Sequence, residues 1–242
     1  MCGIVGYLGP KEAYPILIKG LQRLEYRGYD SAGVALIDQG MVNLTKCKGK
    51  VADLEAKVAD ANVSGNAGIG HTRWATHGVP NDVNSHPHYS QSGDLVIIHN
   101  GIIENYESLK AQLKSRGYVF QSDTDTEVLI NFIEEVKKVE DCSLEDAVRI
   151  AMNEVVGAFA IAILEKGNQD KMVLAKKGSP LVIGVGKDEF FVASDATPFI
   201  EFTQHAIYLE DGEMAVIRRG EDIEIRTVSG NEFIDPNIQK LQ

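Results

Sequence analysis

The sequence opens with Met1-Cys2-Gly3-Ile4-Val5-Gly6-Tyr7-Leu8, a cysteine placed directly before an apolar run. The run over residues 3–8 predicts a first β-strand. Removal of Met1 would leave Cys2 with a free α-amine, so that a nucleophile and its general base share one residue. A thiol with a pKa of about 8.5 and an α-amine with a pKa of about 7.7–8.0 can exchange a proton near neutral pH. The other interpretation is a small apolar side chain buried in a strand, as most free cysteines are.

The composition is that of an ordinary globular chain, with 242 residues of which 44% are apolar and 24% charged. This length allows one large domain or two small ones. No apolar run approaches the roughly 18–20 residues that span a bilayer, and no basic stretch precedes an apolar one at the N-terminus, so we expect no membrane span and no secretion signal. A net charge of −11 argues against nucleic acid or an anionic membrane as the partner. Cys2, Cys47 and Cys142 are odd in number and far apart, which predicts a reducing, cytoplasmic location.

Hydrophobic periodicity and turn residues predict strands, then a block of helices, then strands again. The expected strands are 3–8, 32–37, 42–47, 158–164, 171–175, 181–185, 190–193, 206–209, 213–217 and 222–227, with a hairpin turn at Asp38-Gln39-Gly40. The expected helices lie near 14–25, after Asn105 and before Gly117, along the apolar stripe of 128–136, and after Ser143. This order predicts an α+β fold with antiparallel sheets and no internal domain boundary. Residues 229–242 carry little apolar pattern, and we expect a loose end or a linker there.

A first group of polar residues lies in His71-Thr72-Arg73-Trp74-Ala75-Thr76-His77-Gly78, between a strand-like run and a loop. The planar fork of Arg73 matches a carboxylate with two parallel hydrogen bonds. A surface ion pair is the commoner role of a single arginine. The neighbouring Thr76 and His77 favour a binding role here.

A second group lies in residues 95–105, where a buried strand is expected to end at Asn100-Gly101. Asn100 offers an amide donor, and Gly101 offers a backbone N–H that a ligand can approach closely. These are the parts of an oxyanion hole. The same dipeptide is also the favourite turn of a β-hairpin, so the pattern leaves both interpretations open.

A third group, Ser122-Asp123-Thr124-Asp125-Thr126-Glu127, marks the start of a helix. Either aspartate could be the N-cap residue, which is the ordinary role of an aspartate at this position. Asp125 could instead hold an ammonium group. With Arg73 it would then clamp both ends of a free α-amino acid.

A metal site is the other hypothesis for this region, because five histidines lie within 29 residues and His86-Pro87-His88 looks like a ligand pair. Zinc would accept these imidazoles with Cys2 as a further ligand. The spacings match no regular metal motif, however, so we expect no metal and no cofactor.

Five blocks in the chain together resemble one known family closely. They are CGIVG at residues 2–6, RLEYRGYDSAG at 23–33, HTRWATHG at 71–78, HNGIIEN at 99–105 and SDTDTE at 122–127. In this order they resemble the glutaminase domains of the glutamine–fructose-6-phosphate aminotransferases (isomerising), over Cys2 to about residue 240. The resemblance implies an N-terminal-nucleophile hydrolase fold, a four-layer αββα sandwich of two antiparallel sheets flanked by helices. It also implies one glutaminase domain over residues 1–242, with 229–242 as the linker to a sugar-phosphate isomerase half that this chain lacks.

The resemblance also implies residue roles. Cys2, freed of Met1, would attack the side-chain amide of L-glutamine, and Asn100 and Gly101 would stabilise the oxyanion. Arg73 would bind the substrate carboxylate and Asp125 its ammonium, with Thr76 and His77 in the loop that closes over it. Residues carried over with lesser roles are His86 at the substrate, Arg27 and Gly28 as supports of the nucleophile, and Trp74 as a gate for ammonia.

The resemblance implies that the full-length enzyme makes glucosamine 6-phosphate from fructose 6-phosphate and is a homo-oligomer, with no nucleic acid or membrane partner. Two alternatives stay open. The chain could be the glutaminase domain of another N-terminal-cysteine amidotransferase, or a regulatory module that binds glutamine without hydrolysing it. A chain that kept Met1 would lack the free amine at Cys2, and we expect it to be nearly inactive.

Overall fold

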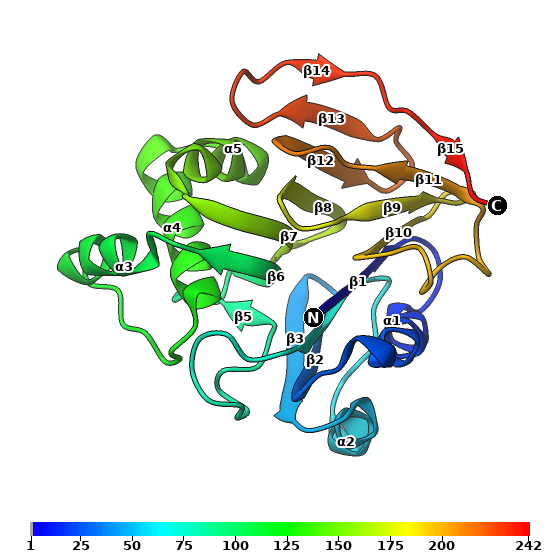
Figure 1. Ribbon diagram of the computed structural model, residues 1–242, viewed down its shortest axis with the longest axis horizontal. Coiled ribbons are helices and arrows are strands. Elements are labelled where there is room, and N and C mark those ends of the chain that lie inside the picture. The colour runs from blue at the N-terminus through cyan, green and yellow to red at the C-terminus, as the bar shows by residue number, and fades with distance from the viewer. Residues whose placement is uncertain (1) are drawn as a thin grey trace.

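The computed structural model describes residues 2–242, which form two antiparallel sheets stacked face to face (Figure 1). The strands of one sheet are β1 (Gly3–Leu8), β2 (Ser31–Asp38), β3 (Met41–Lys48), β4 (Ala67–Arg73), β9 (Val182–Val185), β10 (Phe190–Ala193), β11 (His205–Tyr208) and β15 (Gln239–Lys240). Those of the other are β5 (His88–Tyr89), β6 (Leu95–Ile103), β7 (Gly157–Glu165), β8 (Asn168–Lys177), β12 (Glu213–Arg218), β13 (Glu224–Thr227) and β14 (Phe233–Ile234). The spatial orders are β15-β11-β9-β10-β1-β4-β2-β3 and β14-β13-β12-β8-β7-β6-β5.

Side-chain alternation along the strands builds the layers. In β1, Ile4 and Leu8 face the other sheet, whereas Val5 and Tyr7 face the helices. In β6 the same alternation sends Val96 inward between the sheets. Both faces of the central strands are therefore apolar, which explains why their sequences are nearly continuous apolar runs rather than alternating ones.

Helices cover the outer face of each sheet. They are α1 (Ala13–Arg23) and α2 (Val51–Lys57) on the eight-stranded sheet, and α3 (Tyr106–Ser115), α4 (Asp125–Glu140) and α5 (Leu144–Glu154) on the seven-stranded sheet (Figure 1). Two short 3₁₀ turns follow α1 and α2, at Glu25–Arg27 and Val58–Asp60. The antiparallel sheets confirm the α+β fold that the sequence patterns predict, and the four layers confirm the αββα sandwich that the family resemblance implies.

Most expected elements are confirmed within one or two residues. The hairpin turn between β2 and β3 has Gln39 and Gly40 at φ of 50° and 79°, as a two-residue turn of this type requires. Ser143 caps α5 by accepting the N–H of Asp146 at 3.2 Å. Asn105 precedes α3 as expected but does not cap it, because its side chain bonds the backbone of Glu154 and Val156 instead.

Two expectations are wrong, and one helix has no counterpart among the expected elements. The strand expected to end at Asn100-Gly101 continues to Ile103, because β7 pairs with it throughout. The short helix α2 is not predicted at all. The C-terminal tail is not loose, since β14 pairs with β13 and β15 pairs with β11. No helix within residues 2–242 is both long and apolar enough to cross a membrane.

Candidate active site

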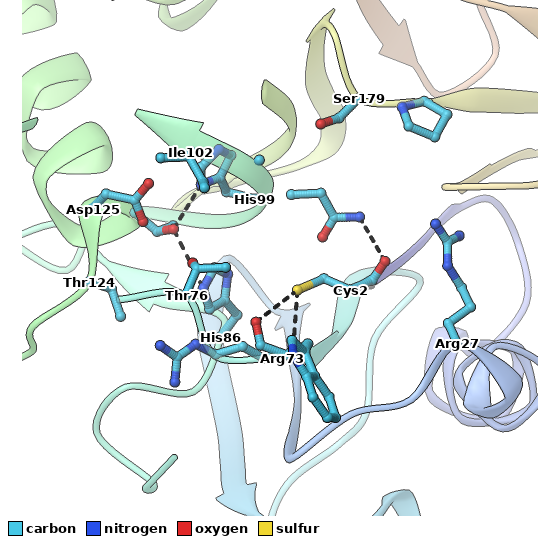
Figure 2. A pocket seen from close by; sticks show the side chains of 15 residues that line it. Cys2, Arg27, Arg73, Thr76, His86, His99, Ile102, Thr124, Asp125 and Ser179 are labelled. Atoms are coloured by element: carbon cyan, nitrogen blue, oxygen red, sulfur yellow. Dashed lines mark hydrogen bonds between the residues drawn. The ribbon is translucent and has the colours of Figure 1, made fainter. Parts of the chain in front are cut away.

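A pocket of about 340 Å³ opens where the start of β1, the end of β4, the middle of β6 and the N-terminus of α4 meet (Figure 2). Its lining brings together residues from distant parts of the sequence: Cys2, Arg27, Arg73, Trp74, Thr76, His86, His99, Asn100, Gly101, Ile102, Thr124, Asp125, Thr126, Ser179 and Pro180. Most residues that the sequence singled out for chemistry are among them.

The Cys2 thiol faces this pocket rather than the apolar core. Its Sγ accepts the backbone N–H of Trp74 at 3.1 Å and lies 3.5 Å from the Trp74 carbonyl oxygen. Burial raises the pKa of the Cys2 thiol above its ordinary value, and the Trp74 hydrogen bond and the Arg73 charge offset this only in part. The thiol is therefore protonated at neutral pH and needs a base to become a nucleophile. The state of Met1 lies outside the described residues.

Asn100 connects β6 to the nucleophile. Its Nδ2 donates to the carbonyl oxygen of Cys2 at 3.1 Å, and its Oδ1 lies 2.9 Å from Nε2 of His71. The side chain is 7% exposed and borders the pocket. Its amide is therefore held beside the thiol by contacts at both ends.

Gly101 is a strand residue with φ at 115°, not part of a hairpin turn. A Cβ at this position would lie 2.2 Å from the carbonyl oxygen of Ala158, so only glycine fits. The backbone N–H of Glu104 donates to the carbonyl oxygen of Val156, which is its partner when the register of β6 and β7 is continued. Every second residue of an antiparallel strand is bonded to its partner in this way, so Asn100 is bonded to β7 and Gly101 is not. The carbonyl of Asn100 therefore points toward β7, and the N–H of Gly101, in the same peptide plane, points away from β7.

Arg73 lies at the end of β4 and is only 3% exposed, so it is not a surface residue. Its Nη2 donates to the carbonyl oxygens of His77 and Gly78. Its Nη1 is buried and has no hydrogen-bond partner within residues 2–242. Burial lowers the pKa of Arg73 from its ordinary value, although the guanidinium stays charged. One terminal nitrogen of Arg73 is thus hydrogen-bonded, and the other keeps an unused donor in a charged residue that lines the pocket.

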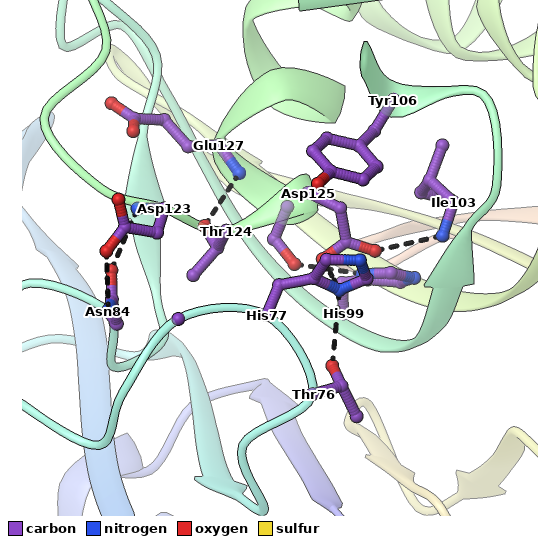
Figure 3. Close-up of polar contacts among 12 residues, drawn as sticks. Thr76, His77, Asn84, His99, Ile103, Tyr106, Asp123, Thr124, Asp125 and Glu127 are labelled. Carbon is purple, nitrogen blue, oxygen red and sulfur yellow. Dashed lines mark hydrogen bonds and ion pairs between the residues drawn. The ribbon is translucent and has the colours of Figure 1, made fainter.

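Asp125 is the first residue of α4, and the N-cap residue is Thr124, whose Oγ1 accepts the N–H of Glu127. Neither aspartate is the N-cap. Asp125 is 4% exposed, and its Oδ2 accepts the N–H of Ile103 at 2.9 Å. Its Oδ1 lies 3.7 Å from Nδ1 of His77 (Figure 3). The Asp125 carboxylate, with one oxygen anchored, therefore borders the same pocket as Arg73.

Thr76 lines the pocket, and its hydroxyl lies 3.5 Å from Nδ1 of His77. His77 does not line the pocket; it packs edge-on against Tyr106 and beside Asp125 (Figure 3). His86 does line the pocket; it is 5% exposed, and its ring stacks on that of His71 with centroids 4.1 Å apart.

The remaining expected residues surround the thiol. Arg27 lines the pocket and donates to Ser194 Oγ at 2.8 Å. Gly28 has φ at 76°, and a Cβ there would meet the ring of Trp74 at 3.8 Å. Trp74 itself is 55% exposed at the mouth of the pocket.

Several lining residues had no distinguishing signal in the sequence. His99, Ile102 and Thr126 flank predicted site residues and are the ones that adjacency could have found. Ser179 and Pro180 follow β8 and reach the pocket only through the sheet topology. As for the metal hypothesis, no three His, Cys, Asp or Glu side chains within residues 2–242 are grouped so as to hold an ion.

Comparison with known proteins defines the class to which this fold and pocket correspond. Residues 71–201 match the family of glutamine amidotransferase domains, and the chain belongs to that family. The solved Bacillus subtilis glutamine phosphoribosylpyrophosphate amidotransferase, complexed with ADP and GMP, superposes with a TM-score of 0.80 at 29% identity, over 96% of this chain and 50% of that one. The fold is accordingly that of the N-terminal-nucleophile amidotransferases.

Within this class, two curated relatives that share one name match nearly the whole chain. The chain is 58% identical, over 100% of its length, to 39% of the glutamine–fructose-6-phosphate aminotransferase (isomerising) of Bacteroides thetaiotaomicron. It is 52% identical, over 96% of its length, to 38% of the Chlorobaculum tepidum enzyme of the same name. The chain thus spans about two fifths of the length of these curated relatives.

Proposed function

We propose that this chain hydrolyses the side-chain amide of free L-glutamine, with Cys2 as the nucleophile. One observation carries the proposal: a half-buried thiol, an anchored amide donor and a guanidinium with one unpartnered nitrogen border the same pocket. A regulatory module that only binds glutamine would need the clamp but not the thiol beside an amide donor.

The reaction begins with proton transfer inside one residue. After removal of Met1, the α-amine of Cys2 takes the thiol proton, and Sγ attacks the side-chain carbonyl carbon of glutamine. The protonated amine then gives its proton to the amide nitrogen, which leaves as ammonia. A γ-glutamyl thioester remains on Cys2. Water adds to the thioester with the same amine as base, and glutamate and the free thiol are released.

Two donors stabilise the tetrahedral intermediates. One is the second hydrogen of the Asn100 amide, whose first is bonded to the Cys2 carbonyl oxygen. The other is the N–H of Gly101, which points away from the β7 ladder. Donors fixed before the reaction stabilise the developing charge without reorganisation.

The clamp, which we define as Arg73 and Asp125, selects a free amino acid. The unpartnered Nη1 of Arg73 binds the α-carboxylate, and Asp125 binds the α-ammonium. Thr76 and His86 line the same pocket, and His77 lies beside Asp125. A glutamine within a polypeptide has neither terminal charge and is rejected.

The names of the relatives support a larger setting for this chemistry. We infer that residues 1–242 are the glutaminase domain of a longer enzyme, with 229–242 leading to a sugar-phosphate isomerase half. There the ammonia would aminate fructose 6-phosphate, Trp74 would gate its passage, and Arg27 and Gly28 would support the nucleophile. The full enzyme would be a homo-oligomer, and the three free cysteines support a reducing, cytoplasmic location.

The test is ammonia release from three substrates: free glutamine, N-acetylglutamine and glutamine α-amide. The chain that begins with Cys2 should hydrolyse free glutamine, and blocking either end should reduce kcat/KM by at least about 10-fold, as loss of a charge-assisted hydrogen bond does. Equal rates on all three would contradict the clamp. Binding of glutamine without glutamate release would support the regulatory module instead.

A further inference from the structure

His71 is a buried residue of β4 that does not line the pocket, and the role assigned to it below rests on the function proposed above. Its Nε2 lies 2.9 Å from Oδ1 of Asn100 and 3.1 Å from the carbonyl oxygen of His99. The sequence suggests no role for it beyond the metal hypothesis. It is nevertheless the contact that holds the far end of the Asn100 amide.

The protonation of the ring follows from these two neighbours. A carbonyl oxygen can only accept, so the contact with His99 requires a hydrogen on Nε2 of His71. The same hydrogen-bearing nitrogen can meet Asn100 only at the amide oxygen. Burial lowers the pKa of His71 to about 3, so the ring is neutral near pH 7 and its Nδ1 carries no proton.

The other end of Asn100 gives the same orientation independently. The carbonyl oxygen of Cys2, 3.1 Å from the amide, is an acceptor and requires the NH₂ group on its side. A flipped amide would set its oxygen against the Cys2 carbonyl and its NH₂ against the Nε2–H of His71. Both contacts would then be repulsive, so a single orientation remains.

The plane of the His71 ring is also fixed. His86 stacks on it with an interplanar angle of 12°, and Nε2 of His86 lies 3.4 Å from the hydroxyl of Thr126. The Thr126 hydroxyl in turn lies 2.9 Å from Nδ1 of His99. The ring that holds Asn100 is therefore held by neighbours from β6, α4 and the loop before β5.

We propose that His71 is a positioning residue for glutamine hydrolysis, which donates from Nε2 to Oδ1 of Asn100 and so directs the NH₂ of that amide toward the thiol and the oxyanion. It does not touch substrate and transfers no proton. Its contribution is to keep the amide from rotating, so it should affect turnover far more than glutamine affinity.

The kinetic test compares His71→Phe, which keeps a ring to stack on His86 but removes the donor, with His71→Gln, which returns an N–H at similar reach. We expect His71→Phe to lower kcat by about 10- to 100-fold with little change in KM, and His71→Gln to recover part of the loss. In an Asn100→Ala background, His71→Phe should have no further effect on kcat. His205→Phe, at an exposed position of β11, is the matched control and should leave both constants unchanged.

An equal loss from His71→Phe in both backgrounds would overturn the proposal, because the effect would not pass through Asn100. So would a rise in KM at constant kcat. If His71→Phe does not fold, the comparison rests on His71→Gln and on the wild-type spectrum described next.

The second readout needs no turnover. In the chain with ¹⁵N-labelled histidine, the His71 signals, assigned by their loss in His71→Gln, should report the neutral Nε2–H tautomer near pH 7. An Nδ1–H tautomer or an imidazolium would overturn the proposal even in an active enzyme. If the wild-type chain releases no glutamate but shows the Nε2–H tautomer, the result contradicts the proposed function and still supports the hydrogen bond from His71 to Asn100.

Discussion

Charged side chains around α5 and in the pocket differ in how completely they are paired. In the α5 ion-pair network, Glu145 lies 2.8 Å from Lys171 and 3.4 Å from Arg218. Arg226 pairs with Glu224 at 2.8 Å and with Asp146 at 3.2 Å. Each of these groups has an oppositely charged partner from another part of the fold. Arg73, by contrast, forms no ion pair among residues 2–242: its Nη2 donates to two backbone carbonyl oxygens, and its Nη1 has no hydrogen-bond partner.

The difference distinguishes a network whose ion pairs stabilise the fold from a site whose unpartnered donor can bind a ligand. Burying a charge without a partner costs free energy, so the stability of the fold gives no reason to keep such a residue. Such incomplete pairing marks functional sites, where the missing partner is the substrate. Changes in the pocket should therefore alter catalysis and spare stability, and changes in the α5 ion-pair network should do the opposite.

The largest expected effect is that of Cys2→Ala, which removes the nucleophile. Glutamate release should fall by at least about 10³-fold, because no other group can form the thioester. Thermal unfolding should stay within a degree or two of the wild-type midpoint, since the thiol makes only weak hydrogen bonds. Residual hydrolysis above one per cent of wild type would mean that another residue attacks the amide.

Asn100→Ala should come next. Loss of one oxyanion donor lowers kcat by roughly 10²- to 10³-fold, and KM should change little because the clamp is intact. The measurement is steady-state glutamate release over a range of glutamine concentrations. A rise in KM with unchanged kcat would assign Asn100 to substrate binding instead.

The clamp variants Arg73→Met and Asp125→Asn should raise KM for glutamine by about 10- to 100-fold, because each removes one charge-assisted contact with the substrate. In Asp125→Asn the amide oxygen could still accept the N–H of Ile103, which keeps the fold of that variant comparable. Wild-type affinity in either variant would contradict the clamp.

The same Arg73→Met variant sharpens the contrast in stability. Replacing a buried, partly unpaired cation by an apolar side chain of similar length should leave the free energy of unfolding unchanged or raised. Lys171→Met, the matched change in the α5 ion-pair network, should lower it, because Glu145 then loses its shortest ion pair. Denaturant unfolding without glutamine measures both.

The smallest effect on activity is expected from Glu145→Gln, which should cost about 1–3 kcal/mol of stability at pH 7 and leave turnover unchanged. Burial raises the pKa of Glu145, but the Lys171 hydrogen bond and the Arg218 charge outweigh it, so the pKa lies below its ordinary value of 4.5. A carboxylate with a lowered folded pKa stabilises the protein above the unfolded pKa and loses this as pH falls through the folded pKa. The wild-type chain should therefore lose this stability below about pH 4.5, and Glu145→Gln should lack that part of the pH dependence.

Local signals in the sequence account for most of the fold. The hairpin at Gln39-Gly40 and the cap at Ser143 depend on neighbouring residues, so the sequence predicts them directly. The dipeptide Asn100-Gly101 favours a turn and so predicts an early end to its strand, and only pairing with β7, more than fifty residues away, overrides that preference. The helix α2 has seven residues, too few to establish a clear apolar period.

The site is predictable to a similar degree and for similar reasons. The five motif blocks point to Cys2, Arg73, Asn100 and Asp125, and all four border one pocket. The pairing state of Arg73, the His71 contact and the approach of Ser179 depend on how distant strands are aligned. No pattern within a single segment contains that information.

The most direct measurement is the intact mass of a chain that begins with Cys2 after incubation with 6-diazo-5-oxo-L-norleucine, a glutamine-like alkylating agent. We predict one adduct, mapped to Cys2 and prevented by excess glutamine, because thiol and clamp belong to the same pocket. Absence of an adduct on this correctly processed chain, or an adduct that glutamine does not prevent, would contradict the assignment of Cys2 as the nucleophile of a glutaminase.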